Sequence, residues 1–222
     1  MKPGLLQISW QRCWSALGTQ GDGIPLMQKL VAAYEEPHRK YHTVQHLAEC
    51  LTLLEDHRHL ALAPAEVEIA LWFHDAIYDT RAADNEAMSA KWAEAELVQA
   101  GVAAEPIKHV TRHILATRHA VVPQGADQML LVDIDLAILG AARPRFVEYE
   151  AQIRAEYSWV PEGIFSAQRS ALLRTFLARE SIYNTPDLKV MFEFQARDNL
   201  AYSLQQLSRH GKAASTRYGP CR

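Results

Sequence analysis

Apolar side chains recur every three or four residues along most of the chain, which is the spacing of one face of an α-helix. The run that follows Thr43 shows this most clearly, with one apolar stripe formed by Val44, Leu47, Leu51 and Leu54. Prolines near the first turn and glycines after the last turn mark where helices begin and end. On these signals we expect helices over residues 5–18, 25–36, 44–57, from 64 past 75, 85–100, 105–119, 127–139, 144–157, 161–179 and 186–210.

No stretch of any length alternates apolar and polar residues as a half-buried strand would. The apolar run at residues 127–139 resembles a strand, but its length and its neighbours favour a helix. There is no internal repeat and no low-complexity linker. The pattern therefore predicts an all-α fold, with a single helical domain over residues 1–210 and a disordered tail over residues 211–222.

Composition narrows the possible partners. The 222 residues include 23 Lys and Arg against 26 Asp and Glu, a formal charge of -3. This balance gives no electrostatic case for a nucleic-acid polymer or an anionic membrane. Three scattered cysteines (Cys13, Cys50 and Cys221) suggest neither a disulfide framework nor a cysteine-based zinc site. No apolar run has the length of a signal peptide or a membrane span, so we expect a soluble cytoplasmic protein.

Histidines are unevenly distributed, since nine of the ten lie between His38 and His119. A lone buried histidine is more often a satisfied core residue than a ligand. Several at helical spacing within one span favour a metal or phosphate site.

The dipeptide His74-Asp75 lies in the most apolar of the predicted helices. A buried ionised carboxylate is costly unless it is paired or bound to a metal, so this pair requires a cation as partner. His46 lies beside the apolar stripe of residues 44–57, and Asp133 and Asp135 interrupt the apolar run at 127–139. Two imidazoles and two carboxylates form a ligand set for one divalent ion, and Mn, Fe, Co, Ni, Zn and Mg all remain open. The alternative is that the carboxylates pair with arginines such as Arg39, Arg154 or Arg169.

This H…HD…D pattern in an all-helical chain resembles the HD superfamily of metal-dependent phosphohydrolases. The surrounding segments at residues 41–47, 70–79, 84–90 and 133–140 resemble a bacterial group of predicted HD phosphohydrolases of unknown substrate. The resemblance implies an HD-type helical bundle and the metal ligands His46, His74, Asp75 and Asp135. Asp135 is favoured over Asp133 as the last ligand because the family's aspartate precedes a basic residue and a leucine. Leu136 stands where that basic residue is expected, and Asp133 is then a residue that supports the ligands.

Other polar residues near this pattern have candidate roles. For contacts with substrate phosphate the candidates are Arg39, Lys40, Arg118 and His119, and for catalysis they are Asp79, His113 and His42. Asp79 follows Asp75 by one helical turn, so a continuous helix would place both on one face. Glu86 could orient a ligand histidine from behind. Each also has a plain interpretation as a solvated charge, a capping group or, for Asp79, a partner of Arg81.

The resulting hypothesis is a metal-dependent phosphohydrolase that acts on a small phosphorylated molecule, with a nucleotide suggested by the resemblance alone. One alternative is an HD-type di-iron oxygenase, for which His113 and His119 would supply the two additional histidines. Another is a non-catalytic module that binds a metal or a nucleotide. The long helix predicted at 186–210 is a candidate homodimer surface, although burial within the monomer explains its apolar residues equally well.

Overall fold

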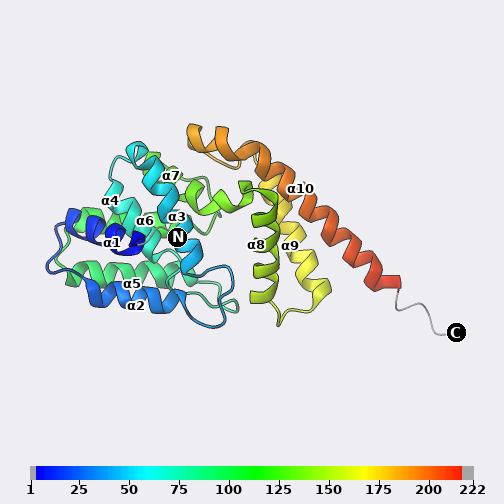
Figure 1. Cartoon of the computed structure of the whole chain (residues 1–222), viewed down its shortest axis with the longest axis horizontal. Helices are drawn as coiled ribbons and strands as arrows, with labels where there is room; N and C mark the ends of the chain where they lie inside the picture. Colours follow the sequence, from blue (N-terminus) through cyan, green and yellow to red (C-terminus); the bar gives the residue numbers. More distant parts are fainter. Residues whose placement is uncertain (1–3, 217–222) are drawn as a thin grey trace. The chain divides into compact units, whose positions relative to one another are not determined.

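The structure, a computed structural model, describes residues 4–216, with side chains up to Arg209 (Figure 1). These residues form ten α-helices and two short 3₁₀ helices and contain no strand, which confirms the predicted all-α class. None of the described helices combines the length and the apolar character needed to cross a membrane.

The chain divides into two compact units, one ending at Asp135 and one beginning at Leu136. A single domain over residues 1–210 therefore stays a prediction. The elements of the first unit are α1 (Leu5–Ala16), α2 (Ile24–Tyr34), α3 (Val44–His57), η1 (Arg58–Leu60), α4 (Pro64–Phe73), α5 (Asn85–Gln99), α6 (Ala104–Ala116) and α7 (Ala126–Asp135).

Helix α4 is the centre of the first unit, where it packs against α1, α3, α5, α6 and α7. Every residue from Val67 to Phe73 is buried, as expected for a helix that is apolar on all sides. The one charge in this stretch, Glu68, is fully buried and is compensated by its neighbours. Its carboxylate accepts hydrogen bonds from Arg12, Arg58 and Ser9.

The prediction that this helix continues past His74-Asp75 is wrong, because α4 ends at Phe73 and the chain then turns. The first residues of α5 hold this turn. Asn85 Oδ1 accepts a hydrogen bond from the backbone N–H of Asp79 at 3.0 Å, and Ser89 Oγ accepts one from Ile77 at 3.0 Å. These side chains satisfy backbone groups that a longer helix would have used. The His-Asp pair consequently lies at the C-terminal end of the most buried helix.

The second unit contains η2 (Leu136–Gly140), α8 (Arg143–Glu156), α9 (Glu162–Leu177) and α10 (Pro186–Thr216). The helix predicted at 127–139 is thus α7 followed by a 3₁₀ turn. Helix α10 packs against η2 and α9, and it continues through residues 211–216, where a disordered tail was predicted. The rest of that predicted tail, residues 217–222, lies outside the described residues.

Candidate metal centre

The first histidine of the centre is presented by the start of α3. Thr43 caps this helix, because its hydroxyl accepts a hydrogen bond from the backbone N–H of Gln45 at 3.3 Å. His46 follows within the first turn and is 2% exposed. The cap and the apolar stripe together set which way the His46 ring faces.

The second histidine caps the C-terminus of α4. His74 Nδ1 lies 2.8 Å from the carbonyl oxygen of Leu71. A carbonyl can only accept, so the Nδ1–H must donate, and in the neutral ring the lone pair is then on Nε2. His74 therefore presents a ligand nitrogen on the side away from Leu71.

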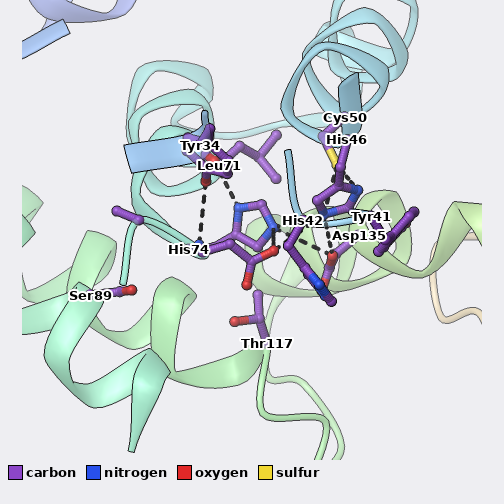
Figure 2. Close-up of polar contacts among 12 residues, drawn as sticks. Tyr34, Tyr41, His42, His46, Cys50, Leu71, His74, Ser89, Thr117 and Asp135 are labelled. Atoms are coloured by element: carbon purple, nitrogen blue, oxygen red, sulfur yellow. Dashed lines mark hydrogen bonds and ion pairs between the residues drawn. The ribbon is translucent and has the colours of Figure 1, made fainter. Parts of the chain in front are cut away.

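Four side chains converge at this point, and Figure 2 labels three of them, His46, His74 and Asp135. His46 Nε2 lies 3.1 Å from His74 Nε2, 3.4 Å from Asp75 Oδ2 and 3.2 Å from Asp135 Oδ1. His74 Nε2 lies 3.0 Å from Asp75 Oδ2 and 3.5 Å from Asp135 Oδ1. Asp135 is the last residue of α7, so α3, α7 and the turn after α4 all contribute.

These distances suit the ligand shell of one divalent ion. Nitrogen and oxygen ligands lie about 2.1 Å from such an ion, which separates neighbouring ligands by about 3.0 Å in an octahedron and about 3.4 Å in a tetrahedron. Hydrogen bonds alone account for the cluster less well, because one Nε2 proton on each ring cannot serve three close partners at once. Histidines must be neutral to bind a metal ion, and with both imidazoles in that state the two carboxylates leave a negative charge that a divalent cation would balance.

The short distances among these four side chains also determine their protonation. Burial would raise the pKa of Asp75 and Asp135, but the neighbouring histidines outweigh burial and hold each pKa well below its usual range. For His46 and His74, burial would lower the pKa, but the surrounding groups outweigh it and raise the pKa well above its usual value. Both carboxylates are therefore ionised, as metal ligands must be.

His46, Cys50, His74 and Asp135 form a largely buried group that could hold a metal ion, since their ligand atoms all lie within 4.8 Å of one another. Sequence reasoning missed Cys50. It follows His46 by four residues on α3, and this one-turn spacing on a partly apolar helix was a usable signal.

Arg39 supports the turn that carries Asp75. Its side chain is 0% exposed, and its guanidinium donates to the carbonyl oxygens of Asp75 at 2.6 Å and Ala76 at 3.0 Å. The hydroxyl of Tyr34 accepts a hydrogen bond from the Asp75 backbone N–H at 3.4 Å, and burial raises the pKa of Tyr34 to about 12. Arg39 was predicted to contact substrate phosphate, but this geometry commits it to the backbone of the turn.

The other predicted phosphate contacts lie in different settings. Lys40 is exposed and donates to the Pro37 carbonyl oxygen at 2.8 Å. Arg118 is 41% exposed, with its Nε 3.5 Å from a carboxylate oxygen of Glu86, so that Glu86 faces an arginine rather than a ligand histidine.

His119 contacts Asp135 on the side of the carboxylate that faces away from the two histidines. Its Nε2 lies 3.0 Å from Asp135 Oδ2, the oxygen that does not face His46 and His74. Its φ of 55° makes it the one described non-glycine residue with left-handed backbone. Such a conformation is unfavourable for a residue with a side chain, and it turns His119 back toward Asp135 after α6 ends.

The predicted catalytic residues are dispersed. Asp79 is exposed beyond the end of α4, and its carboxylate accepts a hydrogen bond from the Arg81 backbone, so the same-face argument with Asp75 does not hold. His113 is buried in α6, and burial lowers its pKa to about 4. His42 is half-buried and stacks on Tyr78 with ring centroids 4.2 Å apart.

His42 is nevertheless close enough to Asp75 for its charge to contribute to the lowered pKa of that carboxyl. Asp133 is fully buried on α7.

Among the described residues, the contacts recorded for the Asp75 and Asp135 carboxylates are with histidines and not with arginines. Arg39 contacts the backbone of Asp75 rather than its carboxylate, and Arg154 and Arg169 pair with Glu162 and Glu150 in the second unit. The three arginines named as partners of Asp75 and Asp135 therefore make their contacts elsewhere.

Comparisons of the chain with protein-family models, with curated proteins and with solved structures found no match.

Proposed function

We propose that this protein is a metal-dependent phosphohydrolase of the HD type, with His46, His74, Asp75 and Asp135 as the ligands of a divalent ion. The observation that supports this most directly is the convergence of two imidazole nitrogens and two carboxylates within 3.0–3.5 Å. The same four residues carry the resemblance noted from the sequence. The substrate in this proposal is a small phosphorylated molecule, for which a nucleotide is the leading candidate.

A divalent ion in this setting supplies an activated water molecule and polarises a phosphoryl oxygen. The chain contributes the remaining functions. Asp75 and Asp135 keep side-chain exposures of 17% and 13%, so solvent still reaches both carboxylates. Lys40 and Arg118 are exposed cations that can offset phosphate charge.

His42 is the best candidate for proton transfer among the three catalytic residues suggested by the sequence. It is half-buried and lies close to Asp75, whereas Asp79 is exposed in the turn after α4. Its ring is oriented by stacking on Tyr78. An imidazole has the unperturbed pKa closest to neutral pH, which suits it to give and take a proton there.

The oxygenase alternative needs two further histidines at the centre. His119 meets this requirement through Asp135, but His113 is on α6, where Asp127 and His109 are the charged groups that influence it. Nothing in the geometry thus favours the oxygenase over the hydrolase.

The proposal is tested by phosphate release from a panel of nucleotides and other phosphate esters with Mn, Co, Ni, Mg and Zn. Asp75→Ala is the test variant and Asp56→Ala the matched control, because Asp56 is an exposed carboxylate on α3 outside the cluster. We expect wild type and Asp56→Ala to release phosphate in a metal-dependent way and Asp75→Ala to release none. Wild-type activity in Asp75→Ala would reject the site.

No turnover by wild type on any substrate, together with stabilisation by metal or nucleotide, would instead support the binding module.

A further inference from the structure

His119 holds the outer oxygen of one of the proposed metal ligands. Its Nε2 lies 3.0 Å from Asp135 Oδ2, whereas Asp135 Oδ1 lies 3.2 Å from His46 Nε2 and 3.5 Å from His74 Nε2. An ionised carboxylate can only accept, so the Nε2–H of His119 donates this hydrogen bond. We propose that His119 is a positioning residue that engages Oδ2 of Asp135 and so leaves Oδ1 as the single oxygen that this side chain offers to the metal ion.

The inference rests on metal binding at this cluster, which is the first step of the proposed function. Carboxylates bind divalent ions through one oxygen or through both, and the second mode takes an additional position in the ligand shell. In metal-assisted hydrolysis, water and a phosphoryl oxygen must also reach the ion. A hydrogen-bond partner for Oδ2 therefore favours the mode that leaves more positions for the reacting groups.

The place of Asp135 in the fold explains why its carboxylate needs a donor on the outer side. Asp135 is the last residue of α7, where the negative end of the helix dipole disfavours a second negative charge. Its side chain is 13% exposed, so most of it is removed from water. Ligand carboxylates in metalloproteins are commonly hydrogen-bonded by a neighbouring residue that fixes their orientation. The imidazole of His119 supplies such a contact.

The backbone at His119 supports the same role. Its φ of 55° is left-handed, a conformation that often follows a helix but is then usually adopted by glycine. A residue with a side chain adopts it at a cost, and the conformation persists where the surrounding contacts hold it. The His119 N–H donates to the Ala116 carbonyl oxygen at 3.0 Å. The chain therefore turns back at the end of α6 and brings the imidazole to Asp135.

The experiment counts the water molecules bound to Mn(II) from the relaxation of water protons in wild type, His119→Ala, His119→Gln and His109→Ala, each saturated with the ion. His109 is the matched control, because its ring also contacts a carboxylate, with Nδ1 2.9 Å from Glu66 Oε2, but outside the cluster. In His119→Ala the released Oδ2 of Asp135 can bind the ion, so we expect a loss of about one bound water. We expect the wild-type number in His109→Ala and in His119→Gln, whose amide N–H can donate to Oδ2.

A further variant, His119→Gly, separates positioning from backbone strain. Glycine removes the imidazole together with the cost of the left-handed φ. We therefore expect His119→Gly to melt at a temperature no lower than His119→Ala and to lose the same bound water. The wild-type number of bound waters in either variant would overturn the inference while leaving the proposed function intact.

The number of metal ions per chain gives a second check. A second Mn(II) that is present in wild type and absent in His119→Ala would overturn the inference, because His119 would then be a direct ligand. Absence of any metal binding by wild type would defeat both this inference and the proposed function.

Discussion

Replacement of Arg39 by methionine is the sharpest test of how the candidate metal centre is held together. The guanidinium donates to the carbonyl oxygens of Asp75 at 2.6 Å, Ala76 at 3.0 Å and His42 at 3.3 Å, and the side chain is fully buried. Buried hydrogen bonds from a charged donor contribute about 1.5–3 kcal/mol each. The third is long and contributes little, so the first two together predict that Arg39→Met lowers the free energy of unfolding by about 3–6 kcal/mol.

The measurement is urea unfolding together with the melting temperature, which should fall by roughly 10 °C for a chain of this size. Metal affinity should fall as well, because the carbonyls of Asp75 and Ala76 are what Arg39 holds in place. Lys40→Met is the matched control, since Lys40 is the exposed neighbouring cation and its ammonium group donates to the Pro37 carbonyl oxygen. If Arg39→Met retained wild-type stability and metal affinity but lost phosphate binding, the assignment of Arg39 to the turn would be wrong.

Three further outcomes are expected. Burial lowers the pKa of His113 from 6.5 to about 4, so the unfolded chain takes up this proton first and stability is lost as the pH falls from about 6.5 to about 4. Between pH 7.5 and pH 5, the free energy of unfolding of His113→Gln should therefore fall by about 2 kcal/mol less than that of wild type, as measured by urea titrations. Parallel pH profiles of the two proteins would refute this. Gly140→Ala would place a Cβ 2.6 Å from Phe192 Cβ, so calorimetry should show a loss of about 1–3 kcal/mol; an unchanged melting temperature would contradict such close packing. Dialysis against EDTA should lower the melting temperature and added Zn or Mn should restore it, whereas a protein indifferent to both would argue against the metal centre.

The helical class and most of the candidate metal-binding residues could be predicted from the sequence because their signals are local. Spacing of three and four residues predicts helices wherever it occurs, and a charged pair in an apolar run requires a partner wherever the run folds. His46, His74 and Asp135 were therefore singled out before their distances were known. The spacing along the chain did not show that these residues meet in the fold. The cost of burying each of them alone favoured such a meeting.

The position at which α4 ends depends on tertiary contacts. The apolar pattern continues past Phe73, yet the backbone there is held by Asn85 and Ser89 from another helix. Asp79 consequently does not share a helical face with Asp75, so the geometric argument for its catalytic role is lost and the role itself stays a prediction. A helix end of this kind depends on hydrogen bonds from residues that come later in the sequence, which a local pattern does not contain.

The roles of the buried charges were likewise assigned by packing. In the sequence Arg39 is a candidate phosphate contact, but in the structure it holds the turn that carries Asp75. Glu68 lies near the start of a predicted helix, and in the structure it is a buried partner of Arg12 and Arg58. Cys50 offered only its one-turn spacing from His46, and that spacing does not say that its sulfur lies close to the His46 ring. Residue type and periodicity specify which groups need a partner, but which partner they find depends on distances between helices far apart in the chain, and these arise only when the core packs.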